Sequence, residues 1–544
     1  MTIAAVAAVP ERATRVTREV VLGSLVTAAI ATLLLLAGPA PGDAPAHLYR
    51  TLLVRHGVYV WDNFWYAGHY PLASYSLLYY LPAAVVGNLP LVFAAAVVST
   101  ALFASIVYRE WGAAALWPSR VFGVLAPAPL FTGLYSYSLG FATMLGALRA
   151  LQSRRTWPVI VLAALTVGFS PLAFAFLCLV LVAVWSAHRR ISRRSLVVGA
   201  GVVAAAGIQF AVLDLFAVPG RYPFHAVNFL GVLGVSGLGF LLARRAHRGR
   251  PLAAFFAVWA LGSVVAFVVP SPFGDNWTRL DAFVFPVMLL TASLAGFRPR
   301  GLATVALTVA LTYNLVPYLL LVPYRLDPRP AHSAFWQPAV EFLRGHSGPN
   351  FRVEVVPTAA HWESYWLPAA GFAVARGWYR QLDIANNPML YRKHLNAASY
   401  RQWLRENAVE YVLLARTQLD GDGGPAEAAL VSSPSSGLEL AFSGPTWQIY
   451  RLPAATPLLT GAARSRIISF GHTTILGTVS AAGRYVLRAH YNPYWKLTGL
   501  GCVTRGPGGM TALELAAPGR FSLSVSATPS ALFDVATADN DKTC

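Results

Sequence analysis

Three side chains suited to acid–base or phosphate chemistry follow closely on one another near the start of the chain. Asp43, His47 and Arg50 lie in the segment GDAPAHLYR, residues 42–50, directly after a long apolar run. Their spacing at i, i+4 and i+7 places them on one face of a helix. A carboxylate there can accept a proton from a hydroxyl group, and an arginine can hold a phosphate. We therefore predict Asp43 as a catalytic base, with His47, Arg50 and the following Arg55 as substrate-binding residues.

Asp43 also fits a purely structural role as the N-cap of that helix. Pro45 would lie in the first turn, where a missing N–H group is harmless. However, Pro45 removes one of the two N–H groups that an N-cap carboxylate normally bonds, and only that of Ala46 is left. The cap would therefore be weak, and both interpretations stay open.

A second group of candidate residues lies in the aromatic segment that follows, YVWDNFWYAGHYPLASYSLLYYLP, residues 59–82. Asp62 is the second candidate for the base, and His69 and Tyr70 are candidate substrate-binding residues. Aromatic rings suit a membrane interface as well as the apolar face of a sugar. For any single ring, the membrane interface is the simpler interpretation.

The composition indicates which kind of protein must position these residues. The chain has 544 residues, of which 56% are hydrophobic and only 12% charged, and its mean hydropathy is +0.52. These values are typical of a polytopic membrane protein, whose partner is the lipid bilayer. The net charge of +19 comes from short basic clusters between apolar segments rather than from one basic stripe, so we predict no nucleic-acid partner.

The apolar runs predict about eleven membrane spans. The first, Val20 to Ala37, is long enough at about 1.5 Å per residue to cross a hydrocarbon core of roughly 30 Å, and it lacks a signal-peptidase-like ending, so we expect it to remain as an anchor. Later runs lie near residues 90–107, 119–134, 137–152, 157–168, 171–187, 195–218, 226–243, 252–269, 281–297 and 301–322.

Basic clusters alternate with neutral or acidic loops and predict the orientation of these spans. The clusters are Arg109, Arg154 with Arg155, HRRISRR (188–194), ARRAHRGR (243–250) and FRPR (297–300). By the positive-inside rule they are cytoplasmic, as are residues 1–19. The membrane domain then covers residues 20–322, with a first outer loop at 39–89, and everything after Val322 lies outside.

Two further predicted outer loops carry ionisable residues. RYPFH (221–225) contains Arg221 and His225, and PFGDNWTRLD (272–281) contains Asp275 and Arg279. A salt-bridged cap at the membrane interface is one interpretation of the second loop. The other is that Arg279 binds a carrier phosphate, because ionisable residues at the end of a span often mark a substrate route. We include all four as candidate substrate-binding residues.

From Pro323 onward the composition becomes that of an ordinary globular protein, which indicates a domain boundary. Residues 323–455 mix helix-like stretches such as YRQWLRENA (400–408) with short strands such as EYVLLA (410–415), and we predict an α/β domain. Residues 456–544 show the period-two alternation of a β-sandwich, for example in RYVLRAHY (484–491).

The predicted α/β domain holds a concentration of aromatic and polar residues. The residues are Trp362, Glu363, Trp378, Arg380 and Asp383. Flat rings beside planar polar groups are what a glycan-binding groove needs. Alternatively, these rings pack against the membrane domain, with arginine and aspartate paired at the seam.

Cysteine usage agrees with the predicted topology. Cys178 lies in an apolar span and is expected to be a small core residue. Cys502 and Cys544 both lie in the predicted outer domain, where a disulfide can form, and we predict that they pair. There is no Cys/His spacing typical of a metal site.

The overall plan resembles the GT-C class of membrane glycosyltransferases. An N-terminal span is followed by a long outer loop with an early aspartate, by the segment YPLASYSLLYYL (70–81), and by many further spans and an outer domain. The resemblance implies a sugar donor carried on polyprenyl phosphate and a catalytic acid in the first outer loop, which falls on Asp43, or on Asp62 as second choice. The segments EYVLL (410–414) and YNPYWKL (491–497) are also similar to the outer domains of large bacterial membrane proteins of this plan, often labelled 6-pyruvoyl-tetrahydropterin synthase-related.

The sequence departs from both patterns in ways that bear on cofactors. It lacks the zinc-binding histidine cluster of the soluble pterin enzyme, an acidic pair in the first loop, and a segment like the WWDYG of oligosaccharyltransferases. A single carboxylate is a poor site for a divalent metal, so we predict no cofactor, and a divalent metal stays an alternative that the sequence does not support.

Three classes of function remain. The favoured one is transfer of a sugar from a polyprenyl-phosphate donor to a cell-envelope glycan or glycolipid acceptor. The second is a transporter or flippase of lipid-linked sugars, which predicts charged groups deep inside several spans. The third is a noncatalytic scaffold for envelope assembly, in which Asp43 is replaceable without loss.

Overall fold

The computed structural model describes residues 3–72, 75–188, 192–216, 222–271, 273–322 and 327–537. The chain forms two compact units. The helical unit comprises residues 1–44, 75–211 and 221–325, and the mixed unit comprises residues 45–74, 212–220 and 326–544. The sequence assigned the whole loop 39–89 to the membrane domain, whereas most of it belongs to the mixed unit.

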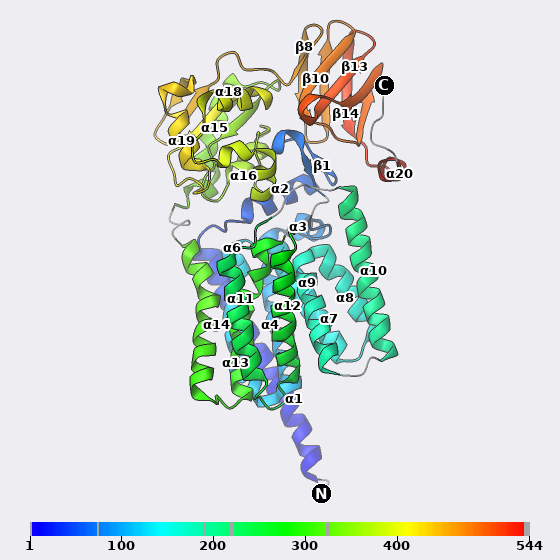
Figure 1. Cartoon of the computed structure of the whole chain (residues 1–544), viewed down its shortest axis with the longest axis vertical. Helices are drawn as coiled ribbons and strands as arrows, with labels where there is room; N and C mark the ends of the chain where they lie inside the picture. Colours follow the sequence, from blue (N-terminus) through cyan, green and yellow to red (C-terminus); the bar gives the residue numbers. More distant parts are fainter. Residues whose placement is uncertain are drawn as a thin grey trace. The chain divides into compact units, whose positions relative to one another are not determined.

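The helical unit contains long apolar helices (Figure 1). Its helices are α1 (Ile3–Ala37), α3 (Tyr80–Val86), α4 (Asn88–Trp111), α5 (Leu116–Leu125), α6 (Ala128–Thr132), α7 (Tyr135–Gln152), α8 (Thr156–Phe169), α9 (Pro171–Ala187), α10 (Arg193–Leu215, whose last turn enters the mixed unit), α11 (Ala226–Ala243), α12 (Arg250–Val268), α13 (Asp281–Leu294) and α14 (Arg300–Leu321). Each predicted apolar run coincides with one of these helices, or, for 119–134, with the pair α5 and α6.

The length and apolar composition of the helices indicate a multi-pass membrane protein. Within the described residues, six helices are long and apolar enough to cross a membrane, or seven if the bent pair Gly274–Leu280 and Phe283–Leu294 is one span. Two further apolar helices, α8 and α9, are shorter. The predicted number of about eleven spans is not confirmed, because several of the predicted runs form short or bent helices.

Aromatic stacking holds the centre of the helical unit together. The rings of Phe141 and Phe283 stack with centroids 4.0 Å apart, and Phe122 stacks on Phe283 at 5.2 Å. These rings come from α7, α13 and α5. Stacking of buried rings adds to the stabilisation from hydrophobic burial. It therefore helps to hold α13 against α5 and α7, which lie more than 100 positions earlier in the sequence.

The first part of the mixed unit is an α/β fold, as predicted. Its sheet has the order β3-β4-β6-β5, with β3 parallel to β4 and the other pairs antiparallel. The strands are β3 (Arg352–Val355), β4 (Val409–Ala415), β5 (Glu439–Ser443) and β6 (Trp447–Arg451), and the helices are α15 (Ser333–His346), α16 (Glu363–Ala369), α17 (Arg380–Asn386), α18 (Ala397–Glu406) and α19 (Gly424–Val431).

The second part of the mixed unit is the predicted β-sandwich, two antiparallel sheets of four strands with the orders β12-β13-β10-β7 and β11-β14-β9-β8. The strands are β7 (Leu459–Gly461), β8 (Ser465–Phe470), β9 (Thr474–Val479), β10 (Gly483–His490), β11 (Trp495–Thr498), β12 (Gly501–Arg505), β13 (Met510–Leu515) and β14 (Gly519–Val525), and helix α20 (Pro529–Thr537) follows. Alternate residues of β10, such as Tyr485 and Leu487, are buried, which is the pattern of a strand with one face in the core.

Cys502 in β12 takes part in a disulfide. Its predicted partner, Cys544, lies outside the described residues, so the pairing stays a prediction. Cys178 in α9 is a free thiol, packed among apolar side chains.

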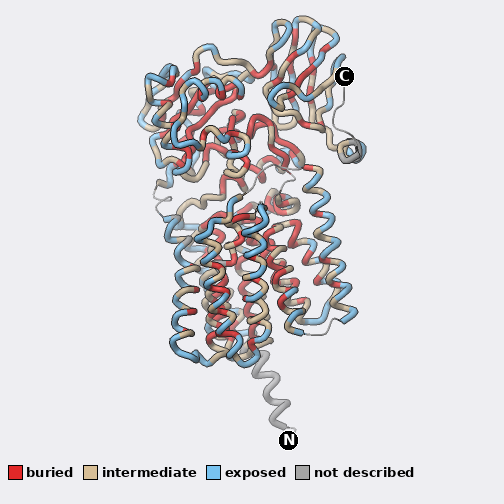
Figure 2. Tube along the Cα trace, viewed as in Figure 1, coloured by how far each residue is buried: buried red, intermediate tan, exposed pale blue. Residues whose placement is uncertain are grey.

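The loop after the first span folds into the mixed unit. It contains α2 (Ala44–Arg55) and the short strands β1 (Trp61–Asp62) and β2 (Tyr70–Pro71). Trp65 Nε1 donates a hydrogen bond to the carbonyl of Ser364 at 2.9 Å, and the Val374 N–H donates to the carbonyl of Phe64 at 2.9 Å. Buried positions predominate along this loop (Figure 2). The aromatic rings predicted to meet lipid or sugar are therefore core residues in large part.

Candidate functional site

Asp43 and Arg279 form an ion pair in the helical unit. Arg279 Nη2 lies 3.9 Å from Asp43 Oδ2, and both side chains are partly exposed, at 30% and 26%. Asp43 immediately precedes α2, and Arg279 lies in the short helix η3 (Gly274–Leu280) before α13. The sequence proposed a role for each of them, but their 236-position separation gave no reason to pair them.

Hydrogen bonds to neighbouring residues hold both members of this pair in position. The Asp43 N–H donates to the carbonyl of Thr132 at 3.2 Å. Gly133, at the C-terminus of α6, has φ +91°, and a Cβ there would lie 2.8 Å from the Asp43 nitrogen. Only glycine allows this approach. Arg279 Nε donates to Asn276 Oδ1 at 3.2 Å, and the Tyr137 hydroxyl donates to the carbonyl of Arg279 at 3.3 Å.

Asp275 and His225 form a second pair in the same unit. The His225 N–H donates to Asp275 Oδ1 at 2.9 Å, and His225 Nδ1 lies 2.5 Å from Asp275 Oδ2. The two predicted loops therefore join through these residues, and the imidazole itself remains exposed. Arg221, the remaining candidate in these loops, lies outside the described residues.

The other candidates of the first loop belong to the mixed unit. His47, Arg50 and Arg55 all lie on α2. Arg50 is buried, and its guanidinium donates to the carbonyl of Leu72 and, at 3.4 Å, to the Tyr379 hydroxyl. Arg55 is exposed at the end of the helix. Because Asp43 belongs to the helical unit, the predicted grouping of these residues around Asp43 stays a prediction.

Asp62 is fully buried, and each carboxylate oxygen has a partner. The Tyr49 hydroxyl donates to Oδ2 at 2.8 Å, and His472 Nδ1 donates to Oδ1 at 2.8 Å. His472 lies between β8 and β9 of the sandwich. This geometry gives Asp62 a role in joining the loop to the sandwich. The sequence did not indicate His472, because it lies in an ordinary turn, GHTT (471–474).

His69 and Tyr70 also have partners in the mixed unit. His69 Nδ1 lies 3.4 Å from Asn386 Oδ1, and its ring is 5.2 Å from that of His490. Burial lowers the pKa of His69 below its usual value. Tyr70 is fully buried, with its ring 4.7 Å from Trp65.

The residues of the predicted glycan groove are mostly internal. Trp362, Glu363 and Asp383 are buried. Glu363 accepts from the Thr358 hydroxyl at 2.6 Å and from His361 Nδ1 at 3.1 Å. These contacts all lie within the mixed unit, so both the glycan groove and the packing against the membrane domain stay predictions.

The two arginines nearby have acidic partners. Arg376 Nη2 lies 2.7 Å from Asp383 Oδ2, and Arg376 Nη1 lies 2.9 Å from Glu427 Oε2. Arg380 pairs with Asp420 at 2.6 Å and with Asp422. Trp378, by contrast, is half-buried. Of the five groove candidates, Arg380 and Trp378 alone are accessible.

No group of three or more His, Cys, Asp or Glu side chains with the geometry of a metal site occurs within the described residues. Whether activity depends on a metal is a separate question, which an assay with chelators would answer.

Comparison with known proteins supplies the fold. No family model and no curated protein matches the sequence. The solved structure of the arabinofuranosyltransferase AftD from mycobacteria aligns with 82% of this chain, with a TM-score of 0.50 and 16% sequence identity. The chain has the GT-C fold. It spans 42% of the length of AftD. ArnT from Cupriavidus metallidurans, solved with bound undecaprenyl phosphate, aligns with 81% of this chain and 98% of its own length, at a TM-score of 0.41 and 12% identity.

The Asp43–Arg279 pair is the candidate reactive site of the helical unit. It combines a proton acceptor with a cation able to bind phosphate. Its partial exposure leaves both groups accessible to a ligand. Asp62 and Asp383 lack that access in the structure.

Proposed function

We propose that the chain is an integral membrane glycosyltransferase that transfers a sugar from a polyprenyl-phosphate donor to a cell-envelope glycan or glycolipid. The observation that carries the proposal is the ion pair of Asp43 and Arg279 within a GT-C fold. In the proposed topology residues 1–19 are cytoplasmic, and the mixed unit faces the extracytoplasmic side. The alternating basic clusters support that orientation.

In the proposed reaction Asp43 accepts the proton of an acceptor hydroxyl as the hydroxyl oxygen bonds to the anomeric carbon of the donor. The bond from that carbon to the phosphate oxygen breaks, and its electron pair leaves with the polyprenyl phosphate. Arg279 stabilises the negative charge on the departing phosphate. The attack comes from the face opposite the phosphate, so the transfer inverts the anomeric configuration.

The geometry of the pair suits an exchange of partners. Its N–O distance of 3.9 Å exceeds the roughly 2.7–2.9 Å of a charge-assisted hydrogen bond. A partly exposed pair of this kind is worth at most about 1 kcal/mol. A donor phosphate can therefore compete with Asp43 for Arg279.

The test follows release of polyprenyl phosphate by purified protein in nanodiscs, supplied with polyprenyl-phosphate sugars and an envelope extract as acceptor. We expect Asp43→Asn to lower the rate by about 10²- to 10⁴-fold, because it removes the base. Arg279→Ala should lower it by about 10²- to 10³-fold, with partial recovery in Arg279→Lys.

The matched controls come from a second arginine–carboxylate pair in the helical unit. Arg248 Nη2 lies 3.2 Å from Glu110 Oε1, and both side chains are exposed. Glu110→Gln and Arg248→Ala should retain wild-type rates. Equal release by wild type and Asp43→Asn, with both folded, would refute the assignment of the base. In proteoliposomes, movement of intact donor across the bilayer without release would instead favour the transporter.

A further inference from the structure

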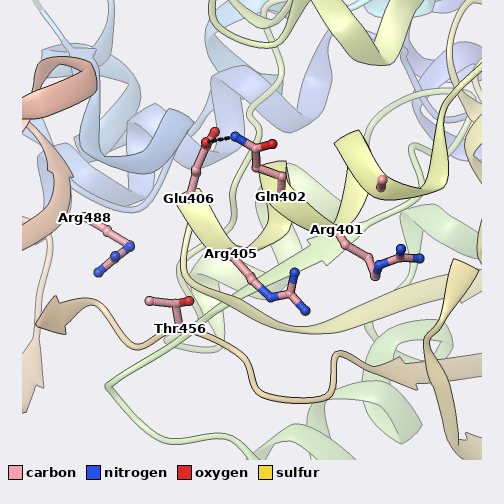
Figure 3. A pocket seen from close by; sticks show the side chains of 7 residues that line it. Arg401, Gln402, Arg405, Glu406, Thr456 and Arg488 are labelled. Carbon is pink, nitrogen blue, oxygen red and sulfur yellow. Dashed lines mark hydrogen bonds between the residues drawn. The ribbon is translucent and has the colours of Figure 1, made fainter.

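An arginine-lined pocket lies in the mixed unit, away from every residue considered so far. Its volume is about 380 Å³. The lining consists of Ala398, Arg401, Gln402, Arg405, Glu406, Thr456 and Arg488 (Figure 3). The first five residues come from α18, Arg488 comes from β10, and Thr456 comes from the chain between β6 and β7.

Helix α18 divides its residues between the core and the pocket. Tyr400, Trp403 and Leu404 are buried in the α/β core. The pocket-lining residues start at Ala398 and recur at i+3, i+4, i+7 and i+8, which is one face of a helix. The arginine pair Arg401 and Arg405 is therefore one turn apart on the same face, where like charges repel.

Neutral groups hold two of the three guanidinium groups in place. Arg401 Nη1 donates to the carbonyl of Ser436 at 2.8 Å. Arg488 Nη1 donates to Thr460 Oγ1 at 2.8 Å and to the carbonyl of Pro457 at 3.1 Å. Burial lowers the pKa of Arg488 below its usual value, although the charge of Glu406 acts in the opposite direction. These contacts fix the positions of the cations but do not neutralise them.

The remaining lining groups leave a surplus of positive charge. Glu406 is the single carboxylate among the lining residues, and it accepts a hydrogen bond from Gln402 Nε2 at 2.8 Å. Among the described residues, the Arg405 side chain has no hydrogen-bond or ion-pair partner. In the view of Figure 3 it lies between Arg401 and Arg488. The lining thus holds three guanidinium groups and one carboxylate.

We propose that this pocket binds an acidic saccharide unit of an envelope glycan, through the anionic group of the sugar and its neighbouring hydroxyls. Arg405 supplies the principal contact with the anionic group, and Arg401 and Arg488 surround it. The Gln402–Glu406 pair and the Thr456 hydroxyl suit sugar hydroxyls. The volume lies at the small end of the roughly 300–1,000 Å³ of ligand pockets, which suits a mono- or disaccharide better than a bare phosphate ion. This inference rests on the proposed function, for which it names the class of acceptor.

The test measures calorimetric binding to the full-length protein in nanodiscs. The probe is cellobiouronic acid, a disaccharide that carries one carboxylate, and cellobiose is its neutral counterpart. We expect cellobiouronic acid to bind and cellobiose to bind at least about tenfold more weakly, because the charge-assisted hydrogen bonds are lost. Arg405→Gln should weaken binding of the acid by about tenfold or more, and higher salt should weaken it further. Arg466→Gln, at an exposed arginine on β8, is the matched control and should bind as wild type does.

Equal binding of the two disaccharides, absence of binding by the acid, or wild-type affinity in Arg405→Gln would each overturn the proposal. Inorganic phosphate binding as tightly as the acid would also overturn it, in favour of a simple anion site. The binding titration and the release assay, each repeated with Asp43→Asn, separate the two proposals. Binding of cellobiouronic acid with no polyprenyl-phosphate release by wild type would support the pocket and refute the proposed transferase. Polyprenyl-phosphate release without binding of the acid would support the transferase and refute the pocket.

Discussion

Asp62 and His472 lie 410 positions apart in the sequence and meet through a hydrogen bond of 2.8 Å from the imidazole Nδ1 to a carboxylate oxygen. The other oxygen accepts from the Tyr49 hydroxyl. The Asn63 N–H also donates to the carbonyl of His472 at 2.9 Å. The loop after the first span is therefore joined to the β-sandwich by both side chains and backbone, and the two are expected to unfold together.

His472→Ala should destabilise the mixed unit. The substitution leaves one oxygen of the buried Asp62 without its donor, at a cost of about 1–3 kcal/mol. Hydrogen exchange of the loop around Trp65, whose ring stacks on that of Tyr49 at 4.6 Å, reports loop unfolding. His394→Ala, at an exposed position, is the control. A midpoint of thermal unfolding unchanged from wild type would show that the hydrogen bond contributes nothing to holding the loop.

Acid should loosen the same region through His490. Burial, assisted by His69 and Arg352, lowers the pKa of His490 from 6.5 to about 4. The unfolded chain then binds more protons than the folded chain between those two values, so stability falls as the pH drops from about 6.5 towards 4. The shift corresponds to at most about 3 kcal/mol.

His490→Gln tests this pH dependence, because glutamine does not titrate. Thermal unfolding between pH 7.5 and 5 should show a smaller fall in the variant than in wild type. His69 contributes a residual slope in the same direction, since burial also lowers its pKa. If the unfolding temperatures of the two proteins fall equally with pH, folding does not lower the pKa of His490.

Arg376 should be indispensable to the α/β part of the mixed unit. It is buried against Asp383, Glu427 and, at 3.6 Å, Glu354. Burial and the neighbouring carboxylates, Glu427 first among them, raise the pKa of Glu354 well above its usual value. Arg376→Met leaves the other two carboxylates without their cation and should cost about 3–5 kcal/mol.

A second substitution distinguishes charge from packing at this site. If uncompensated charge is the cause, Asp383→Asn in the Arg376→Met background should recover part of the loss in denaturant unfolding. Arg392→Met, at an exposed arginine, should leave stability unchanged. A double variant no more stable than Arg376→Met would assign the loss to packing.

The fold could be predicted from the sequence wherever local pattern determines structure. Apolar runs identified the helices, and the alternation in 484–491 identified strand β10. The number of spans could not be predicted with the same success, because 119–134 and 281–297 form short or bent helices whose ends depend on neighbours rather than on composition. The assignment of loop residues to the mixed unit depends on contacts such as Asn63 with His472, which no local pattern records.

The candidate site, too, could be predicted from local sequence only in part. Composition and position drew attention to Asp43 and Arg279 separately, since each is an ionisable residue at the end of an apolar run. Their pairing is a tertiary contact and required the structure. Conversely, the aromatic and polar pattern around Asp383 resembled a binding surface because a buried ion-pair network uses the same residue types. The pocket on α18 could not be predicted from the sequence, because Arg488 joins it from strand β10, which is distant in the chain.

Gly133→Ala should impair transfer without touching a proposed reactive group. The new Cβ would lie 2.8 Å from the backbone nitrogens of Asp43 and Ala44, and alanine is strained at φ +91°. The Asp43 backbone must then shift, and a displacement of about 1 Å at a catalytic group can cost on the order of 10²-fold in rate. Gly207→Ala is the matched control, because nothing lies within 4 Å of the added Cβ on α10. Polyprenyl-phosphate release should therefore fall sharply in Gly133→Ala and stay at the wild-type level in Gly207→Ala. Full activity in the first variant, with both proteins folded, would mean that the position of Asp43 is irrelevant to transfer, and the base would have to be sought elsewhere in the chain.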